Sequence, residues 1–174
     1  MSLNALMKLS NNAVGECKME GFPGWIEIQG WDWEVEAETS WTKGGGASVG
    51  KPNPGKMNWE HYFDKSSPTI LKFICTGTSF DRVELQMFKG TGASIQTGSA
   101  NNFFSMVMEG AFITKVNQSA TEEGNVVQKV EMVFKQVTIS YKAQEDGGAT
   151  KGGKAGTTGA PISVTWDIPG GKVS

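Results

Sequence analysis

The chain of 174 residues is long enough for a single domain with an appreciable core, which we expect to span residues 1–174. Its formal net charge of -2 and its pI of about 5.5 argue against the basic face that binds nucleic acid. No stretch approaches the roughly 20 apolar residues of a membrane span, and residues 1–8 lack the charged and apolar regions of a signal peptide. We therefore expect a soluble chain made in the cytoplasm, without membrane insertion; if it leaves the cell, a route other than general secretion carries it.

Apolar and polar residues alternate at the period of a β-strand in the first part of the chain. Residues 6–9 predict a short strand, residues 25–39 a longer one and residues 57–63 a third extended segment. In the long strand, Trp31 and Trp33 share one face and a row of acids occupies the other. A strand spaces such acids about 6.6 Å apart along a line, whereas paired catalytic carboxylates face each other across a cleft. We interpret the row as solvated or pore-facing: Asp32, Glu34, Glu36 and Glu38.

A glycine-rich segment, residues 43–56, separates the second and third strands. It contains Gly45-x-x-x-x-Gly50-Lys51, which matches the front of a phosphate-binding P-loop. A P-loop needs Ser or Thr after the lysine and a helix that begins there. Pro52 stands in that place, and Asn53-Pro54-Gly55 cannot start a helix. We therefore predict no nucleotide site, but a flexible arm that joins two strands and acts outside its own subunit.

A short helix is predicted after the third strand. Ser67 is a good N-cap, Pro68 suits the first helical position, and Gly77 ends a helical body over residues 69–76. This body is apolar nearly all round, so we expect it to be buried on more than one side.

The middle of the chain predicts two strands, over residues 82–88 and 102–116. The second is apolar on both faces, with Phe104 and Met106 on one and Phe103 and Val107 on the other. Such a strand needs its own core on one side and a further surface, such as a neighbouring subunit, on the other.

The last part of the chain predicts two more strands, over residues 126–141 and 162–168, with Trp166 as the anchor of the second. The apolar phase changes within residues 126–141, which a bulge near Lys135-Gln136 would explain, since it lets one strand serve two surfaces. Residues 145–160 are rich in glycine and lack an apolar anchor, so we expect them to be mobile. Together with the 23 glycines, these strands predict an all-β barrel or sandwich with one short helix.

Candidate catalytic and metal-binding residues are few. His61 is the only histidine, so a multi-histidine metal site is excluded, and no partner in the sequence marks it as a general base. We interpret it as a packing or surface residue. Cys17 and Cys75 are too few for a disulfide framework and suit small buried positions, with a disulfide between them left open. We predict no catalytic residue, no metal and no cofactor.

Four tryptophans allow an alternative function. Trp25, Trp41, Trp59 and Trp166 could form an exposed sugar-binding platform on a β-sandwich, which would make the chain a carbohydrate-binding module. The other interpretation places them in the core and in interfaces, because aromatic side chains supply the largest burial per residue.

Several motifs in order resemble one family. They are Gly15-Glu16, then Ile26-Glu27-Ile28-Gln29-Gly30-Trp31-Asp32-Trp33, then the glycine-rich segment, then Tyr62-Phe63-Asp64-Lys65-Ser66-Ser67-Pro68, and last Val164-Thr165-Trp166-Asp167-Ile168. Their order and spacing resemble the Hcp (haemolysin-coregulated) proteins, which form the inner tube of bacterial type VI secretion systems.

The resemblance implies a structural subunit that is not an enzyme. Its fold would be a flattened two-sheet β-barrel with a flanking helix and a long glycine-rich extended loop. Six subunits would form a ring, rings would stack into a tube, and the tube would meet a spike, a sheath and small effectors and be exported without a cleaved signal peptide. Strands around residues 103–116 and 126–141 would bury apolar surface between subunits.

The resemblance also suggests residues for two roles. Asp32 and Thr121 are candidates for pore-facing positions, by alignment alone. The candidate ring-stacking residues lie in the extended loop: Gly44, Gly45, Gly46, Val49, Gly50, Lys51 and Pro52.

Overall fold

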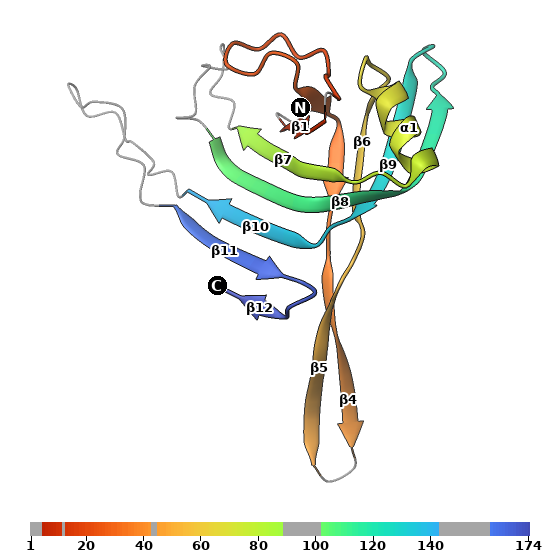
Figure 1. Cartoon of the computed structure of the whole chain (residues 1–174). Coiled ribbons are helices and arrows are strands. Elements are labelled where there is room, and N and C mark those ends of the chain that lie inside the picture. The colour runs from red at the N-terminus through yellow and green to blue at the C-terminus, as the bar shows by residue number, and fades with distance from the viewer. Residues whose placement is uncertain (1–4, 12, 43–44, 89–101, 143–160) are drawn as a thin grey trace, which may run out of the picture.

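The computed structural model describes residues 5–11, 13–42, 45–88, 102–142 and 161–174. These residues form twelve strands and one helix (Figure 1). The elements are β1 (Ala5–Leu9), β2 (Ile26–Ile28), β3 (Gly30–Asp32), β4 (Val35–Thr42), β5 (Gly46–Pro54), β6 (Met57–Tyr62), α1 (Ser67–Thr76), β7 (Phe80–Phe88), β8 (Asn102–Ala120), β9 (Val126–Val133), β10 (Gln136–Tyr141), β11 (Ile162–Asp167) and β12 (Lys172–Val173). The all-β class with a short helix is therefore confirmed.

Two sheets fold over a common core and share the long strand β8. The first sheet has the order β12-β11-β10-β8-β7-β1-β2, and the second joins β3, β6, β9 and the C-terminal half of β8. The order of the first sheet has two ends, β12 and β2, so its ladder is not closed into a barrel. All the pairings are antiparallel, which suits strands with one face on a core and one face outward.

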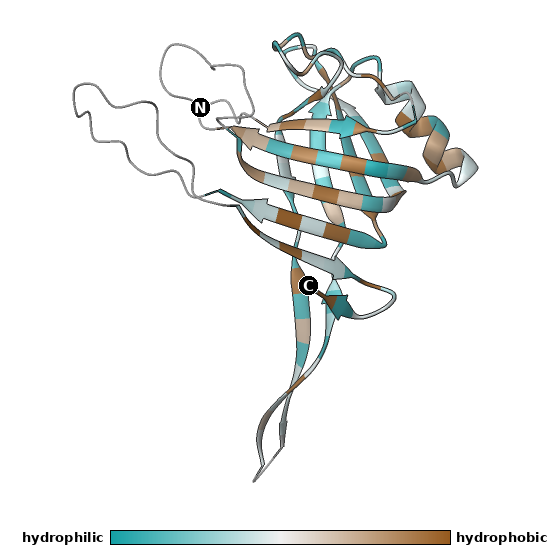
Figure 2. Ribbon diagram, turned by 60° about the vertical axis from the view of Figure 1, so that its left-hand side comes forward, coloured by the Kyte–Doolittle hydropathy of each residue, from teal (hydrophilic) through white to brown (hydrophobic). Residues whose placement is uncertain are grey.

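The core lies between the two sheets and follows from the alternation in the sequence. Along β6 and β9 every second side chain is buried, and Figure 2 shows alternating apolar and polar residues along the strands. Methionine and branched aliphatic side chains dominate this core. The largest fully buried apolar side chains are Met7, Ile26, Ile28, Met57, Ile70, Phe80, Leu85, Met106, Met108 and Met132.

The predicted strand over residues 25–39 is divided into three in the structure. β2 pairs with β1 in the first sheet, whereas β3 pairs with β6 in the second, so the chain changes sheets at Gln29. The Gln29 N–H donates to the Glu60 carbonyl at 2.9 Å and holds this crossing in place. The remainder, β4, leaves both sheets and pairs only with β5 among the described strands.

The predicted change of surface near Lys135-Gln136 is found, but it is a break between β9 and β10 and not a bulge, because the two residues between these strands lie opposite two residues of β8. β9 pairs with β6 and β8 in the second sheet, and β10 pairs with β8 and β11 in the first. Between them the Lys135 N–H donates to the Glu109 carbonyl at 3.0 Å. One stretch of chain thus serves both sheets, as its change of phase indicated.

The helix begins one residue earlier than predicted, because Ser66 rather than Ser67 occupies the N-cap position. Gly77 ends it in the left-handed conformation, with φ of 66°, and its N–H donates to the Phe73 carbonyl. Burial on several sides is not found within one chain: Ile70 is fully buried, whereas Leu71 is 41% exposed.

Three further expectations meet different outcomes. Cys17 is buried as expected but Cys75 is exposed, and both are free thiols. The segment 145–160 lies outside the described residues, as does Gly44. Within the described chain, no helix has the length and apolar character needed to cross a membrane.

Candidate functional site

A two-stranded hairpin, β4 with β5, projects away from both sheets, and we call it the arm (Figure 1). The sequence predicted a flexible connector over residues 43–56, but the structure corrects this, because residues 46–54 form a regular strand. The register pairs Val35 with Pro54 and Trp41 with Ala47, with a bulge opposite Glu38. The arm is therefore an ordered two-stranded element.

The glycines of the arm serve close approach and turning. Gly46 has a φ of +83°, which suits the end of the hairpin turn. A Cβ atom on Gly50 would come within 3.2 Å of the Glu38 carbonyl oxygen, which is a tight contact, so the bulge favours a residue without a side chain. Composition alone does not distinguish this role of glycine from flexibility, which explains the wrong prediction.

The candidate ring-stacking residues are placed together by this hairpin. Gly45 lies in the turn, and Gly46, Val49, Gly50, Lys51 and Pro52 are exposed along β5. Val49 is 69% exposed, which is unusual for a large aliphatic side chain. Within the described part of the chain, only Pro52 of this set borders the body of the protein, at the groove described next.

An apolar groove lies where the arm joins the body of the protein, and we call it the basal groove. It has a volume of about 320 Å³ and is lined by Trp33, Val35 and Pro52 from the arm side and by residues of β10, β11 and β12. The rings of Trp33 and Trp166 lie 6.5 Å apart in it. Sequence reasoning missed this groove, because its walls come from segments more than 80 residues apart.

The two candidate pore-facing residues lie on different elements. Asp32, at the end of β3, accepts a hydrogen bond from Asn58 Nδ2 at 3.2 Å. Thr121 lies in the turn between β8 and β9, where its Oγ1 accepts from the Asn125 N–H at 3.2 Å. Both residues are exposed.

Asp32 also lines a shallow concavity of about 580 Å³ on the outer face of the second sheet. The surface has mixed charge, with Lys129 Nζ 3.9 Å from Glu60 Oε2 and with Glu131 and Lys115 beside them. Thr121 is not among its lining residues. The sequence pointed to the row of acids but not to these basic neighbours, which come from β8 and β9.

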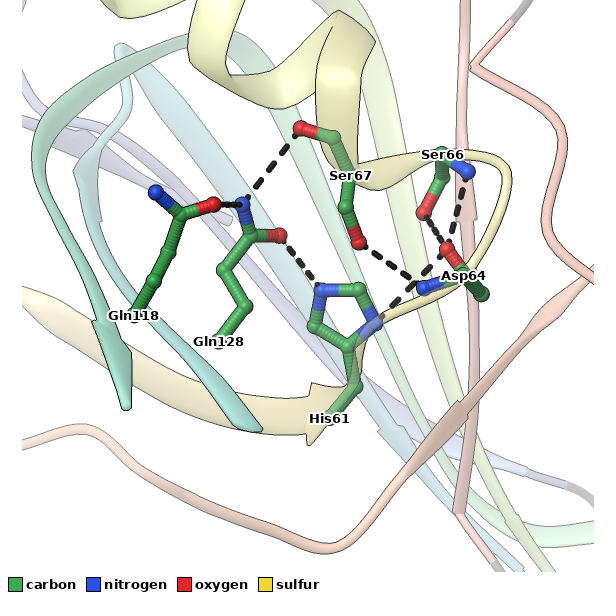
Figure 3. Close-up of polar contacts among 6 residues, drawn as sticks. All are labelled: His61, Asp64, Ser66, Ser67, Gln118 and Gln128. Atoms are coloured by element: carbon green, nitrogen blue, oxygen red, sulfur yellow. Dashed lines mark hydrogen bonds and ion pairs between the residues drawn. The ribbon is translucent and has the colours of Figure 1, made fainter. Parts of the chain in front are cut away.

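His61 is a buried packing residue in a polar network beneath the helix (Figure 3). Its Nε2 lies 2.7 Å from Gln128 Oε1, and because an amide oxygen only accepts, Nε2 carries the proton. Burial lowers the pKa of His61 against the opposing effects of Gln128 and Asp64, so the ring is neutral. Its Nδ1 has no hydrogen-bond partner among the described residues and lies 3.8 Å from Asp64 Oδ1.

The same network fixes the start of the helix to the second sheet. Gln128 Nε2 donates to the Ser67 carbonyl at 3.4 Å, and the Asp64 N–H donates to Ser67 Oγ at 3.0 Å. The Ser66 N–H in turn donates to Asp64 Oδ1 at 2.8 Å. These bonds give His61 and Gln128 a structural role between the helix and the second sheet.

The tryptophans do not form the platform of the carbohydrate-binding alternative. Trp25 and Trp59 are buried, and Trp166 is half-buried against the core, whereas Trp41 is 81% exposed on the arm. Among the described residues, no group of three or more His, Cys, Asp or Glu side chains could hold a metal ion.

Comparison with protein families assigns this architecture. Residues 6–141 match the family described as "Type VI secretion system effector, Hcp". The chain belongs to the Hcp family. The match covers the second sheet, the helix, the arm and the first sheet except β11 and β12, so the predicted resemblance is confirmed over most of the chain.

Curated relatives of the Hcp chain come from Pseudomonas aeruginosa. One, named "Major exported protein", is 23% identical over 149 residues, which cover 80% of this chain and 82% of the relative. Another, named "Protein hcp1", is 23% identical over 169 residues, which cover 97% of this chain and 96% of the relative.

Solved structures share the Hcp fold. A type six secretion system protein aligns with a TM-score of 0.80 at 21% identity and covers 99% of this chain and 100% of its own. Hcp1 from Salmonella typhimurium aligns with a TM-score of 0.72 at 18% identity, over 100% of both chains. With the family match, these findings make the chain a structural tube subunit of type VI secretion and not an enzyme.

Proposed function

We propose that six copies of this chain form a ring and that the rings stack into a tube through their arms. The observation that carries the proposal is the arm itself, a two-stranded sheet that projects from the body without a third strand among the described residues. An isolated hairpin is marginally stable in water and leaves the outer edge of each strand free to pair. A neighbouring copy that adds backbone hydrogen bonds to these edges would supply the missing support.

Exposed apolar side chains on the strands support lateral contacts within the ring. Phe112 on β8, Val126 and Val133 on β9, and Tyr141 on β10 are between 36% and 48% exposed. Burial of such surface contributes about 25 cal/mol per Å². Leu71 on α1 is also exposed, so the helix adds apolar surface for contact with a neighbouring subunit. Such a contact would bury the second apolar side of the helix that the sequence predicted.

The pore of the ring would be lined by the concavity of mixed charge that contains Asp32, and Thr121 would face the same space. Charged side chains of both signs suit a wall that contacts water and cargo without retaining it. Small effectors would travel inside the ring, while the outer partners would be the spike and the sheath of the secretion system. The relative named "Major exported protein" supports export, which would proceed from the bacterial cytoplasm to the medium or a target cell without a cleaved signal peptide.

The oligomer mass tests the ring. Light scattering should give about six times the chain mass of 18.7 kDa, and negative-stain images should show annuli. A chain that stays monomeric at high concentration would contradict the ring proposal.

A shortened arm tests stacking separately. Deletion of residues 39–49 keeps the pair Ala37 and Pro52 and leaves Glu38, Gly50 and Lys51 as a three-residue turn. We expect rings of unchanged mass that no longer form tubes, measured by sedimentation and electron microscopy. Tubes as long and as frequent as those of the full chain would remove the arm from the stacking contact.

A further inference from the structure

We propose that the arm of one copy places its Trp41 in the basal groove of the next copy. This inference rests on the stacked rings of the proposed function and names the anchor and its receiving surface. Neither surface is covered by the described residues of its own chain: Trp41 is 81% exposed, and in the groove Val35 is 46% and Val164 44% exposed.

The end of the arm has one apolar face. The register pairs Trp41 with Ala47 and Thr39 with Val49, so that these four side chains lie on the same side of the hairpin. The opposite side is polar, with Ser40 Oγ and Ser48 Oγ 2.5 Å apart. An exposed tryptophan beside an exposed valine on a projecting element is the composition of an interface anchor.

The basal groove has matching chemistry. Its lining side chains are all apolar, and they include the half-buried rings of Trp33 and Trp166 with Ile139 and Val164 beside them. Its volume of about 320 Å³ falls within the range of pockets that take a ring-sized group. Trp41 would meet aromatic and aliphatic partners there, so its burial would leave only the indole N–H to find an acceptor at the rim.

The arm cannot fill the groove of its own chain. Val35 lines the groove, and Trp41 lies six residues further along the same strand, roughly 20 Å away. The hairpin pairing keeps β4 extended over this distance on both sides of the bulge. The tip of one copy and the base of another therefore make a heterologous, head-to-tail contact, and such contacts repeat along a stack.

The size of the contact favours a second copy within a ring over a free partner. A tryptophan buries roughly 150–250 Å², so even with the groove walls the contact stays below the ~1,000 Å² of a stable pairwise interface. One arm would hold weakly. A ring presents several arms to several grooves at once, and simultaneous engagement multiplies weak contacts.

Cross-linking tests the contact directly. In a Cys75→Ser background, rings of a tagged Ala47→Cys chain, which keeps Trp41 and places the thiol on the residue paired with it, are mixed with rings of an untagged Val164→Cys chain and oxidised. We expect a disulfide-linked heterodimer on a non-reducing gel, several-fold more abundant than with Val14→Cys, a matched control that is 53% exposed and lies between β1 and β2. Equal yields from Val164→Cys and Val14→Cys would overturn the docking.

Stacking by the Trp41→Ser variant provides the second readout, with Val14→Ser as its control. We expect both variants to keep the ring mass and only Trp41→Ser to lose tubes. Trp41→Ser rings that stack like the unaltered chain would overturn the docking. Slow labelling of Val164→Cys by maleimide in single rings would also overturn the docking, because it would show that a neighbour within the same ring covers the groove. A monomeric unaltered chain would instead overturn the ring proposal.

Discussion

Replacement of Gln128 by leucine should destabilise the fold by about 2–3 kcal/mol. The Gln128 side chain is fully buried and bonds to His61 at 2.7 Å, to the Ser67 carbonyl at 3.4 Å and to Gln118 at 3.5 Å. Leucine fills a similar volume, so the main loss is the partner of the His61 Nε2–H. A buried unsatisfied donor costs about 1–3 kcal/mol, and the two longer bonds add a smaller amount.

A double substitution separates this mechanism from a packing defect. His61→Phe removes the donor and keeps a ring next to Trp59, whose ring centroid lies 5.1 Å from that of His61. In the double variant His61→Phe/Gln128→Leu, neither the His61 Nε2–H donor nor the Gln128 Oε1 acceptor is left buried without its partner. The free energy of unfolding of the double variant should therefore fall by at least about 1 kcal/mol less than the summed falls of the two single variants.

Urea unfolding at a fixed protein concentration measures these changes, because assembly adds stability that depends on concentration. Gln118→Leu is the matched control, since Gln118 is exposed and its bond is long; it should change stability by less than about 0.5 kcal/mol. Single-variant losses that add to within about 0.5 kcal/mol in the double variant would refute the reasoning.

Three further outcomes are expected. Burial lowers the pKa of His61 below 6.5 in the folded chain, so the unfolded chain takes up the proton first as the pH falls. The free energy of unfolding should therefore be highest above pH 6.5 and fall below it, by at most about 1.4 kcal/mol per pH unit. In urea titrations, His61→Phe should remove this slope between pH 5.5 and 6.5. Phe80→Ala should lower the free energy of unfolding by about 3–5 kcal/mol, because Phe80 is fully buried and stacks on the helix through Phe73 at 4.4 Å; an effect below about 1 kcal/mol in the same titrations would contradict this core position. An aromatic disulfide reagent should label Cys75 rapidly and Cys17 only on unfolding, since Cys17 is buried and burial raises its pKa; rapid labelling of two thiols per folded chain would oppose it.

The sequence allowed most strands to be predicted, because a core between two sheets imposes alternation on each strand. The ends of β1, β6, β7 and β11 fall within two residues of their predicted positions. The change of phase near Lys135-Gln136 also carried its information locally, since a strand that moves between sheets must change which residues point inward. Strand positions and the change of phase can be read from one segment of sequence, because they depend only on which side chains of that strand point into the core.

The arm and the polar network could not be predicted in the same way. The order of β5 depends on pairing with β4 and on the close approach of Gly50 to Glu38, which composition does not reveal. His61 and Gln128 lie 67 residues apart, and neither carries a sequence signal of the other. The basal groove likewise exists only once β11 and the base of the arm lie together.

The least accurate prediction for the single chain is informative about the assembly. Burial of α1 on several sides was inferred from its apolar sequence, yet Leu71 and Cys75 are exposed in one copy. Apolar patterning records whether a side chain leaves water, and it does not distinguish the core of one chain from a contact between chains. Trp41 and Leu71 are apolar although both are exposed in the single chain. Burial against a neighbouring copy would explain why these positions hold apolar side chains.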